Sequence, residues 1–198
     1  MKTDETLLYY NTNAPTFTEG TLNVDFSHVQ NKFLAKLNSG AFILDFGCGS
    51  GRDTKYFLEK GYEVEAIDGS VELCKIASKY TGIKVKHMLF QELQEIEKYD
   101  AVWACSSILH LPYEELVVVM KKMITALKEN GLLYTSFKYG IFEGMRNGRY
   151  FIDMTEESLE NLLQEVGGIE IEEQWITSDV RPGRGEEKWL NRFLRKKS

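Results

Sequence analysis

An acid followed by three glycines at alternating positions is the chemically most informative pattern in this 198-residue sequence: Asp45, Gly47, Gly49 and Gly51. Apolar residues run up to the pattern, which predicts a strand that ends in a tight turn. Glycine lets the backbone adopt positive φ and approach a ligand more closely than any Cβ would allow. A helix after the turn would direct its free N–H groups at that ligand. The pattern therefore predicts a turn that cradles a small molecule, whereas glycines alone would also fit a flexible loop.

Asp68 closes a second apolar run and is the expected partner of this turn. A carboxylate can accept hydrogen bonds from both hydroxyls of a ribose. A strand, a glycine turn, a helix, a second strand and a terminal acid together describe a nucleoside site. Dinucleotide dehydrogenases use G-x-G-x-x-G, whose third glycine would fall on Arg52, so the sequence disfavours a nicotinamide cofactor.

The spacing of this acid and its glycines resembles motif I of the class I S-adenosylmethionine-dependent methyltransferases. Residues 99–112 resemble motif IV of that family, and residues 129–138 are similar to its helix–glycine–strand segment before the fifth strand. The resemblance covers residues 40–140. In detail the sequence looks most like small bacterial methyltransferases related to the tellurite-resistance enzymes, a group that includes many proteins with an unknown acceptor.

The resemblance implies S-adenosyl-L-methionine as the cofactor, with its methionine part facing the glycine turn. In most relatives the third strand ends in an acid that binds adenine. Leu89 and Phe90 stand there in this sequence, which predicts an apolar surface for adenine. The predicted cofactor-binding residues are Asp45, Gly47, Cys48, Gly49, Arg52, Asp68, Gly69, Leu89, Phe90 and Ala104. No metal site is predicted.

The segment 104–107 reads Ala-Cys-Ser-Ser, without the Asx-Pro-Pro-aromatic tetrad of amino-methyltransferases that act on nucleic-acid bases. His110 is a weak candidate for a general base, because an imidazole titrates near neutral pH. A packing or capping role is the alternative that we favour for it, and His28 and His87 are expected to be structural. The catalytic residues otherwise stay unknown. A soft or already ionised acceptor requires little help from a base. Because the sequence offers no strong general base, it favours such an acceptor slightly.

Arg181 and Arg184 are the predicted acceptor-recognition residues, in a loop at 179–185 with a Pro-Gly turn. Guanidinium groups there would suit an anionic acceptor. The alternative is a solvated loop whose arginines pair with Glu186 or Glu187.

Five aromatic residues carry weaker predictions. Tyr9, Tyr10 and Phe17 precede the first helix of the expected core. They either fold over the cofactor as a lid or tether the N-terminal segment by apolar contacts. Trp175 and Trp189 are expected in the core rather than as a platform for the substrate.

Helical and strand patterns alternate along the chain, which predicts a parallel sheet covered on both faces. We expect helices at 25–38, 52–60, 71–80, 113–129 and 156–166, a short helical piece near 91–97, and strands at 41–46, 62–67, 83–88, 99–104 and 132–137. Two further strand-like runs, at 169–176 and 188–194, are joined by too few residues for a crossover helix, so the last strand should be antiparallel. A short final helix is the alternative. The predicted fold class is α/β, a single doubly wound Rossmann-like sheet of seven strands with the last antiparallel.

Composition fits one globular domain, with 43% hydrophobic residues. We expect a helical lid or cap at 1–39, a cofactor-binding core at 40–140, and a C-terminal helix and strand hairpin at 141–198. No apolar run approaches the ~20 residues of a membrane span. The N-terminus is polar, and three cysteines without C-x-x-C spacing predict free thiols in a reducing cytosol. A cytoplasmic protein without a membrane partner is therefore expected.

The net charge of −6 disfavours a nucleic-acid partner, because phosphate binding requires a basic surface. We predict an S-adenosylmethionine-dependent methyltransferase that acts on a small-molecule acceptor by in-line methyl transfer. One alternative is a cofactor-binding sensor or subunit without transferase activity. Another is an RNA or protein methyltransferase, because basic residues gather in 179–198. The sequence leaves the oligomeric state open.

Overall fold

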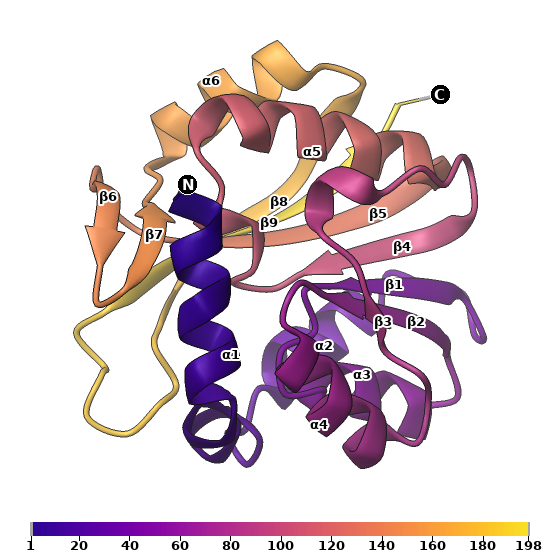
Figure 1. The fold of residues 1–198 in the computed structure, drawn as a ribbon. Helices are drawn as coiled ribbons and strands as arrows, with labels where there is room; N and C mark the ends of the chain where they lie inside the picture. Colours follow the sequence, from indigo (N-terminus) through magenta and orange to yellow (C-terminus); the bar gives the residue numbers. More distant parts are fainter. Residues whose placement is uncertain (1, 198) are drawn as a thin grey trace.

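Seven strands form one sheet in the order β3-β2-β1-β4-β5-β9-β8 in the computed structural model, which describes residues 2–197 (Figure 1). The pairs among the first five strands of this order are parallel, and β9 is antiparallel to both of its neighbours. The predicted α/β class with an antiparallel last strand is therefore confirmed, and the alternative of a final helix is wrong. The strands are β1 (Phe42–Phe46), β2 (Glu63–Asp68), β3 (Lys86–His87), β4 (Tyr99–Ala104), β5 (Leu127–Lys138), β8 (Ile169–Ser178) and β9 (Lys188–Lys196).

Helices cover both faces of the sheet (Figure 1). One layer holds α2 (Ser27–Leu34), α3 (Arg52–Glu59) and α4 (Val71–Thr81), and the other holds α5 (Tyr113–Ala126) and α6 (Glu156–Val166). Successive strand residues point to opposite faces. In β4, Trp103 packs on Phe33 and Phe57 of the first layer, whereas Val102 joins the cluster that contains α5 and α6. Burial on both faces explains why these strands are continuous apolar runs.

A long N-terminal helix, α1 (Lys2–Thr21), stands beside α4 and the hairpin strand β7 (Figure 1). The Thr6 hydroxyl oxygen accepts the Tyr150 backbone N–H at 2.9 Å, which fastens the helix to the hairpin. On the other side, the Ser70 hydroxyl donates to Asn11 Oδ1 at 2.8 Å. Hydrogen bonds thus dock α1 to the elements on both of its sides.

The hairpin itself, β6 (Glu143–Arg146) and β7 (Arg149–Ile152), was not predicted. Its two-residue turn is Asn147-Gly148, with φ of 51° and 75°. Positive φ at both positions is typical of the type I′ turn that joins two twisted strands. The Asn-Gly pair was the signal in the sequence that could have located this hairpin.

Several predicted boundaries differ from the structure, and tertiary pairing explains one of them. The helix predicted to 129 ends at Ala126, since the carbonyls of Thr125 and Ala126 accept N–H groups of Glu97 and Lys98 at 2.9 and 2.8 Å. Leu127 then pairs with β4. The helix at 25–38 is limited to Ser27–Leu34, the strand at 83–88 to Lys86–His87, and the helical piece near 91–97 to a 3-10 turn, η1 (Phe90–Glu92). A second 3-10 turn, η2 (Ile108–His110), follows β4.

The basic C-terminal segment forms strand β9 instead of a free tail. Arg192 is buried and donates to the Glu156 carbonyl at 3.0 Å, and Arg195 pairs with Glu172. These two arginines of β9 are therefore held by contacts within the protein. No helix within residues 2–197 has the length and apolar character that a membrane crossing requires.

Candidate functional site

The glycine turn between β1 and α3 forms one wall of a cavity at the carboxyl ends of the strands. Gly47, Gly49 and Gly51 have φ of 86°, 56° and 83°. A Cβ on Gly47 would lie 2.5 Å from the Ser107 Cβ, so this glycine is required for packing. A Cβ on Gly49 would lie 3.1 Å from the Phe17 ring of α1. The turn therefore exposes backbone at the cavity wall, and the Phe17 ring of α1 lies next to it.

Asp68 lies at the end of β2 and lines the same cavity. Its two carboxylate oxygens accept the backbone N–H groups of Gly49 and Ser70 at 2.9 and 2.8 Å. Burial raises the pKa of Asp68 despite these bonds. No Lys or Arg among residues 2–197 forms an ion pair with it, so each oxygen keeps a lone pair for another donor. This arrangement suits a pair of neutral hydroxyl groups.

Asp45 lies behind the turn and not in the cavity wall. The Thr54 hydroxyl donates to its Oδ2 at 2.5 Å, which ties β1 to α3. Burial, together with the nearby negative charge of Asp53, raises the pKa of Asp45 to about 8. Ala104 is also buried away from the cavity, whereas the other eight predicted cofactor residues line it.

Asp53, which the sequence reasoning missed, organises the start of α3. It accepts hydrogen bonds from Arg52, from the Gln30 amide at 2.7 Å and from the Trp103 indole at 2.8 Å. Burial alone would raise the pKa of Asp53, but Arg52 and these donors hold it below the usual range. The Arg52 guanidinium also lies over the Phe26 ring, 4.6 Å from its centroid. An acid beside a basic residue in the first turn of a helix was the available signal.

The carboxyl ends of β4 and β5 contribute small polar groups to the cavity: Cys105, Ser106, Ser107 and Ser136. Ser106 has a φ of 53° and donates its N–H to the Ser136 hydroxyl at 2.8 Å. A non-glycine residue in this region is strained, and such strain gathers at functional sites. Burial raises the pKa of the Cys105 thiol to about 12, so it stays a neutral thiol at neutral pH.

His110 lines the cavity, but both of its ring nitrogens are engaged within the protein. Nδ1 lies 2.6 Å from the Tyr150 carbonyl, which can only accept, so Nδ1 carries the proton. Nε2 then accepts from the Tyr10 hydroxyl at 2.8 Å. Burial lowers the pKa of His110 to about 4. These contacts favour the packing role over that of a general base.

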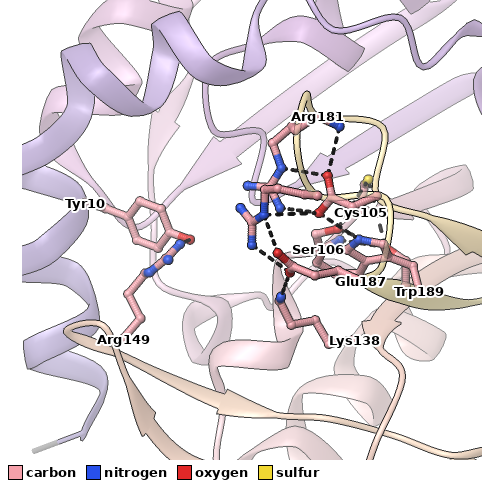
Figure 2. Close-up of polar contacts among 11 residues, drawn as sticks. Tyr10, Cys105, Ser106, Lys138, Arg149, Arg181, Glu187 and Trp189 are labelled. Carbon is pink, nitrogen blue, oxygen red and sulfur yellow. Dashed lines mark hydrogen bonds and ion pairs between the residues drawn. The ribbon is translucent and has the colours of Figure 1, made fainter.

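The loop between β8 and β9 lines the cavity, as the topology predicts, but its arginines are paired. Arg181 forms a bidentate pair with Asp179, at 2.9 and 2.5 Å. Arg184 forms a similar pair with Glu187, at 2.5 and 2.7 Å, and Glu187 also contacts Lys138 (Figure 2). The geometry therefore supports the alternative in which the loop arginines serve internal ion pairs, with Asp179 in place of Glu186.

The aromatic residues take three different positions. Trp175 is partly buried and packs on Tyr134 and Phe193 at the edge of the core, so the prediction of a core position was incomplete. Trp189 lines the cavity and donates to Asp179 at 3.1 Å, so that prediction was incomplete for it as well. Tyr10 and Phe17 also line the cavity.

Comparisons with known proteins agree with this geometry. Residues 43–131 match the family model described as a methyltransferase domain. The ubiquinone biosynthesis O-methyltransferase of Xanthomonas axonopodis pv. citri is 29% identical over 106 residues, which cover 50% of this chain and 43% of the relative. The chain spans 30% to 52% of the length of the first curated relatives that it matches.

Two solved structures show the same fold. The 1,6-didemethyltoxoflavin-N1-methyltransferase of Burkholderia thailandensis, with 1,6-didemethyltoxoflavin and S-adenosylhomocysteine bound, has a TM-score of 0.79 at 22% identity, covering 99% of this chain and 87% of that chain. The cyclase SpnF has a TM-score of 0.75 at 16% identity, covering 96% and 94% of the two chains. At these identities the likeness concerns the fold.

Proposed function

We propose that this chain is a class I S-adenosylmethionine-dependent methyltransferase that transfers a methyl group to a small-molecule acceptor. The methyltransferase-domain match over residues 43–131 and the shared fold support the predicted family and cofactor. The finer resemblance to the tellurite-resistance-related group stays a prediction. The observation that carries the proposal is one cavity that joins the glycine turn and Asp68 to the ends of β4 and β5.

We call the part of the cavity lined by Gly47, Gly49, Asp68, Leu89 and Phe90 the cofactor end. Its residues fit a nucleoside that carries an amino-acid tail. Asp68 would accept the ribose hydroxyls, and Gly47 and Gly49 would let the backbone approach the ligand. Leu89 and Phe90 would provide the apolar surface for adenine, with Phe90 supported by the Phe46 ring at 4.7 Å. The bound cofactor would supply a methyl group already activated by its sulfonium.

We call the part of the cavity lined by Cys105, His110, the β6–β7 hairpin and the β8–β9 loop the acceptor end. Its residues would align the acceptor and exclude water, which are the main requirements of an in-line displacement. Cys105 and His110 are both neutral near pH 7 because burial disfavours their charged forms. Neither is therefore a strong base or nucleophile. This supports an acceptor that is soft or already ionised.

We also propose that α1 acts as a lid over the cavity. Phe17 faces Gly49 at the cofactor end, and Tyr10 contacts His110 at the acceptor end. One helix thus covers both parts, and a cavity closed in this way favours a small acceptor over a polymer. In β9, Arg192 is buried and Arg195 is ion-paired, which gives the alternative of RNA or protein methylation little support.

Cofactor binding without methyl transfer is a second candidate function. The likeness to the cyclase SpnF favours it, because the same fold there serves another reaction. A sensor or subunit would bind the cofactor without consuming it.

Calorimetry with the purified chain tests the first step of the proposal. We expect binding of S-adenosylmethionine and S-adenosylhomocysteine and none of NAD. Incubation with methyl-labelled cofactor and a small-molecule cell extract, followed by mass spectrometry for methylated products, tests the second step. Binding without any labelled product would favour the sensor or subunit, and binding of NAD alone would overturn both.

A further inference from the structure

The cations that line the cavity differ in one respect, which is whether a carboxylate compensates their charge. The lining cations are Arg52, Lys138, Arg149, Arg181 and Arg184. Four of them are paired: Arg52 with Asp53, Lys138 and Arg184 with Glu187, and Arg181 with Asp179. Arg149 forms no ion pair with any residue of the described range 2–197. It is therefore the cavity cation whose charge the fold leaves uncompensated.

Aromatic rings hold the Arg149 side chain in place. Its guanidinium carbon lies 4.5 Å from the Tyr9 ring centroid and 5.1 Å from that of Phe151. A guanidinium stacks well on aromatic faces, and its in-plane N–H donors then stay available for a ligand. Ring contacts thus orient the group without neutralising it.

The hydrogen bonds of Arg149 also leave its charge uncompensated. Nη1 donates to the Tyr10 hydroxyl at 3.3 Å, and the buried Nε has no partner in the described structure. Tyr10 is a neutral partner, since its own proton is directed to His110 and burial raises its pKa. Figure 2 shows Tyr10 and Arg149 apart from the ion-paired group of Arg181, Glu187 and Lys138. An arginine has five donors, and the chain engages few of these.

We infer that Arg149 binds a carboxylate of the methyl acceptor, so that the acceptor is a small organic anion. The inference rests on the proposed methyl transfer. A partly buried charge without a counter-ion is unfavourable, and a bound carboxylate would relieve this with a charge-assisted, bidentate contact. The charges of the loop arginines Arg181 and Arg184 are already balanced by carboxylates, so an anion has less to gain from them.

The neighbouring Arg146 provides a matched control. It lies directly opposite Arg149 in the hairpin, but it pairs with Asp153 at 2.7 Å and does not line the cavity. Arg149→Gln and Arg146→Gln therefore remove the same charge from the same hairpin. Only the first removes a donor from the cavity.

Binding of matched carboxylate and carboxamide probes would test the inference. The protein is saturated with S-adenosylhomocysteine and titrated with acetate, acetamide, benzoate and benzamide, followed by ligand-observed NMR. We expect at least one carboxylate to bind about tenfold or more tightly than its amide, as for other charge-assisted contacts. Arg149→Gln should abolish this preference, Arg149→Lys should retain part of it, and Arg146→Gln should keep it.

Three results would overturn the inference: no preference for a carboxylate in the wild type, a preference that survives in Arg149→Gln, or weaker S-adenosylhomocysteine binding in that variant. The last would place Arg149 on the carboxylate of the cofactor instead. If Arg149→Gln fails to fold, Arg149→Lys takes its place, because it keeps the charge and loses the bidentate fork. A carboxylate preference that is unchanged in Arg149→Lys would then overturn the inference, and a reduced preference would support it. Failure of the wild type to bind S-adenosylhomocysteine would instead overturn the proposed function.

Discussion

The two ends of the cavity are built in different ways and leave opposite charges uncompensated. The cofactor end comes mainly from the segment 47–69, with Leu89 and Phe90 added, and it contains the glycine backbone of the turn and the unpaired acid Asp68. The acceptor end is assembled from α1, the β6–β7 hairpin and the β8–β9 loop, and it contains the unpaired cation Arg149. A neutral diol suits the first and an anion the second. Under the proposed function, the first end would serve as a general cofactor site and the second as a specific acceptor site.

Helix α1 connects the two ends, and its contacts differ between them. Phe17 meets the glycine turn by van der Waals contact. Tyr10 meets His110 and Arg149 through hydrogen bonds that depend on the protonation state of the imidazole. Because these contacts differ in kind, a substitution that weakens cofactor binding should leave the carboxylate preference of the acceptor end measurable, and the reverse should also hold.

Gly49→Val should give the largest effect, confined to the cofactor end. The branched side chain would occupy the space through which the backbone approaches the ligand, and Phe17 already lies 3.1 Å from the Cβ position. We expect a loss of more than about 3 kcal/mol in cofactor binding by calorimetry. Gly61→Val is the control, because Gly61 has a φ of 84° with open space around it. That variant should bind normally, and normal binding by Gly49→Val would show that the site is misplaced.

Low pH should destabilise the folded protein through His110, at the acceptor end. Burial lowers its folded pKa to about 4, below the ordinary value of 6.5. A lowered histidine pKa contributes stability that is complete above the unfolded pKa and is lost as pH falls from 6.5 to 4. We expect the free energy of unfolding to fall by about 3 kcal/mol across that window from this group. Denaturant unfolding at a series of pH values measures it.

His110→Gln should remove this part of the pH dependence, since an amide can donate to the Tyr150 carbonyl and accept from Tyr10 without titrating. His87→Gln is the control, because it removes an exposed imidazole outside the cavity. A pH profile that is identical in the wild type and His110→Gln would contradict the prediction.

Two acids at the cofactor end should respond very differently to substitution by asparagine. Asp68→Asn should weaken S-adenosylmethionine by ~2 kcal/mol, since a charged acceptor of hydroxyl hydrogen bonds contributes ~1.5–3 kcal/mol. Asp45→Asn should change binding by less than ~0.5 kcal/mol, because asparagine resembles a neutral carboxyl in shape and the Asp45 pKa of about 8 keeps that acid protonated at pH 7. Calorimetry on both variants decides. Equal losses would mean that Asp45 contacts the cofactor after all.

The cofactor end could be predicted from the sequence because its determinants are local. The glycine turn and Asp68 lie within one strand–helix–strand unit, and eight of the ten predicted residues line the cavity. The position of Asp45 behind the turn was not predictable from spacing, since it follows from the packing of β1 on α3, where Thr54 donates to its carboxyl group.

The acceptor end was harder to predict because it depends on which charges find partners across the fold. Arg181 and Arg184 were placed correctly beside the cavity, but their pairing with Asp179 and Glu187 follows from the loop geometry. Arg149 was missed together with its hairpin. The periodic pattern of four-residue strands is weak, and only the Asn-Gly turn marks them.

The double substitution Arg181→Ala with Arg184→Ala should give the smallest effect on the ligand-binding properties of the two ends. Each guanidinium is held by an internal carboxylate, so removing both should leave the carboxylate preference of the S-adenosylhomocysteine-loaded protein within about twofold of the wild type. Asp179 is buried and would lose its ion pair, so this variant should also lose folding stability, which is measured separately by denaturant unfolding. The NMR titration with benzoate and benzamide measures the preference, with Arg149→Gln as the reference. A loss as large as in Arg149→Gln would assign anion recognition to the β8–β9 loop and reverse the comparison between the paired and unpaired arginines.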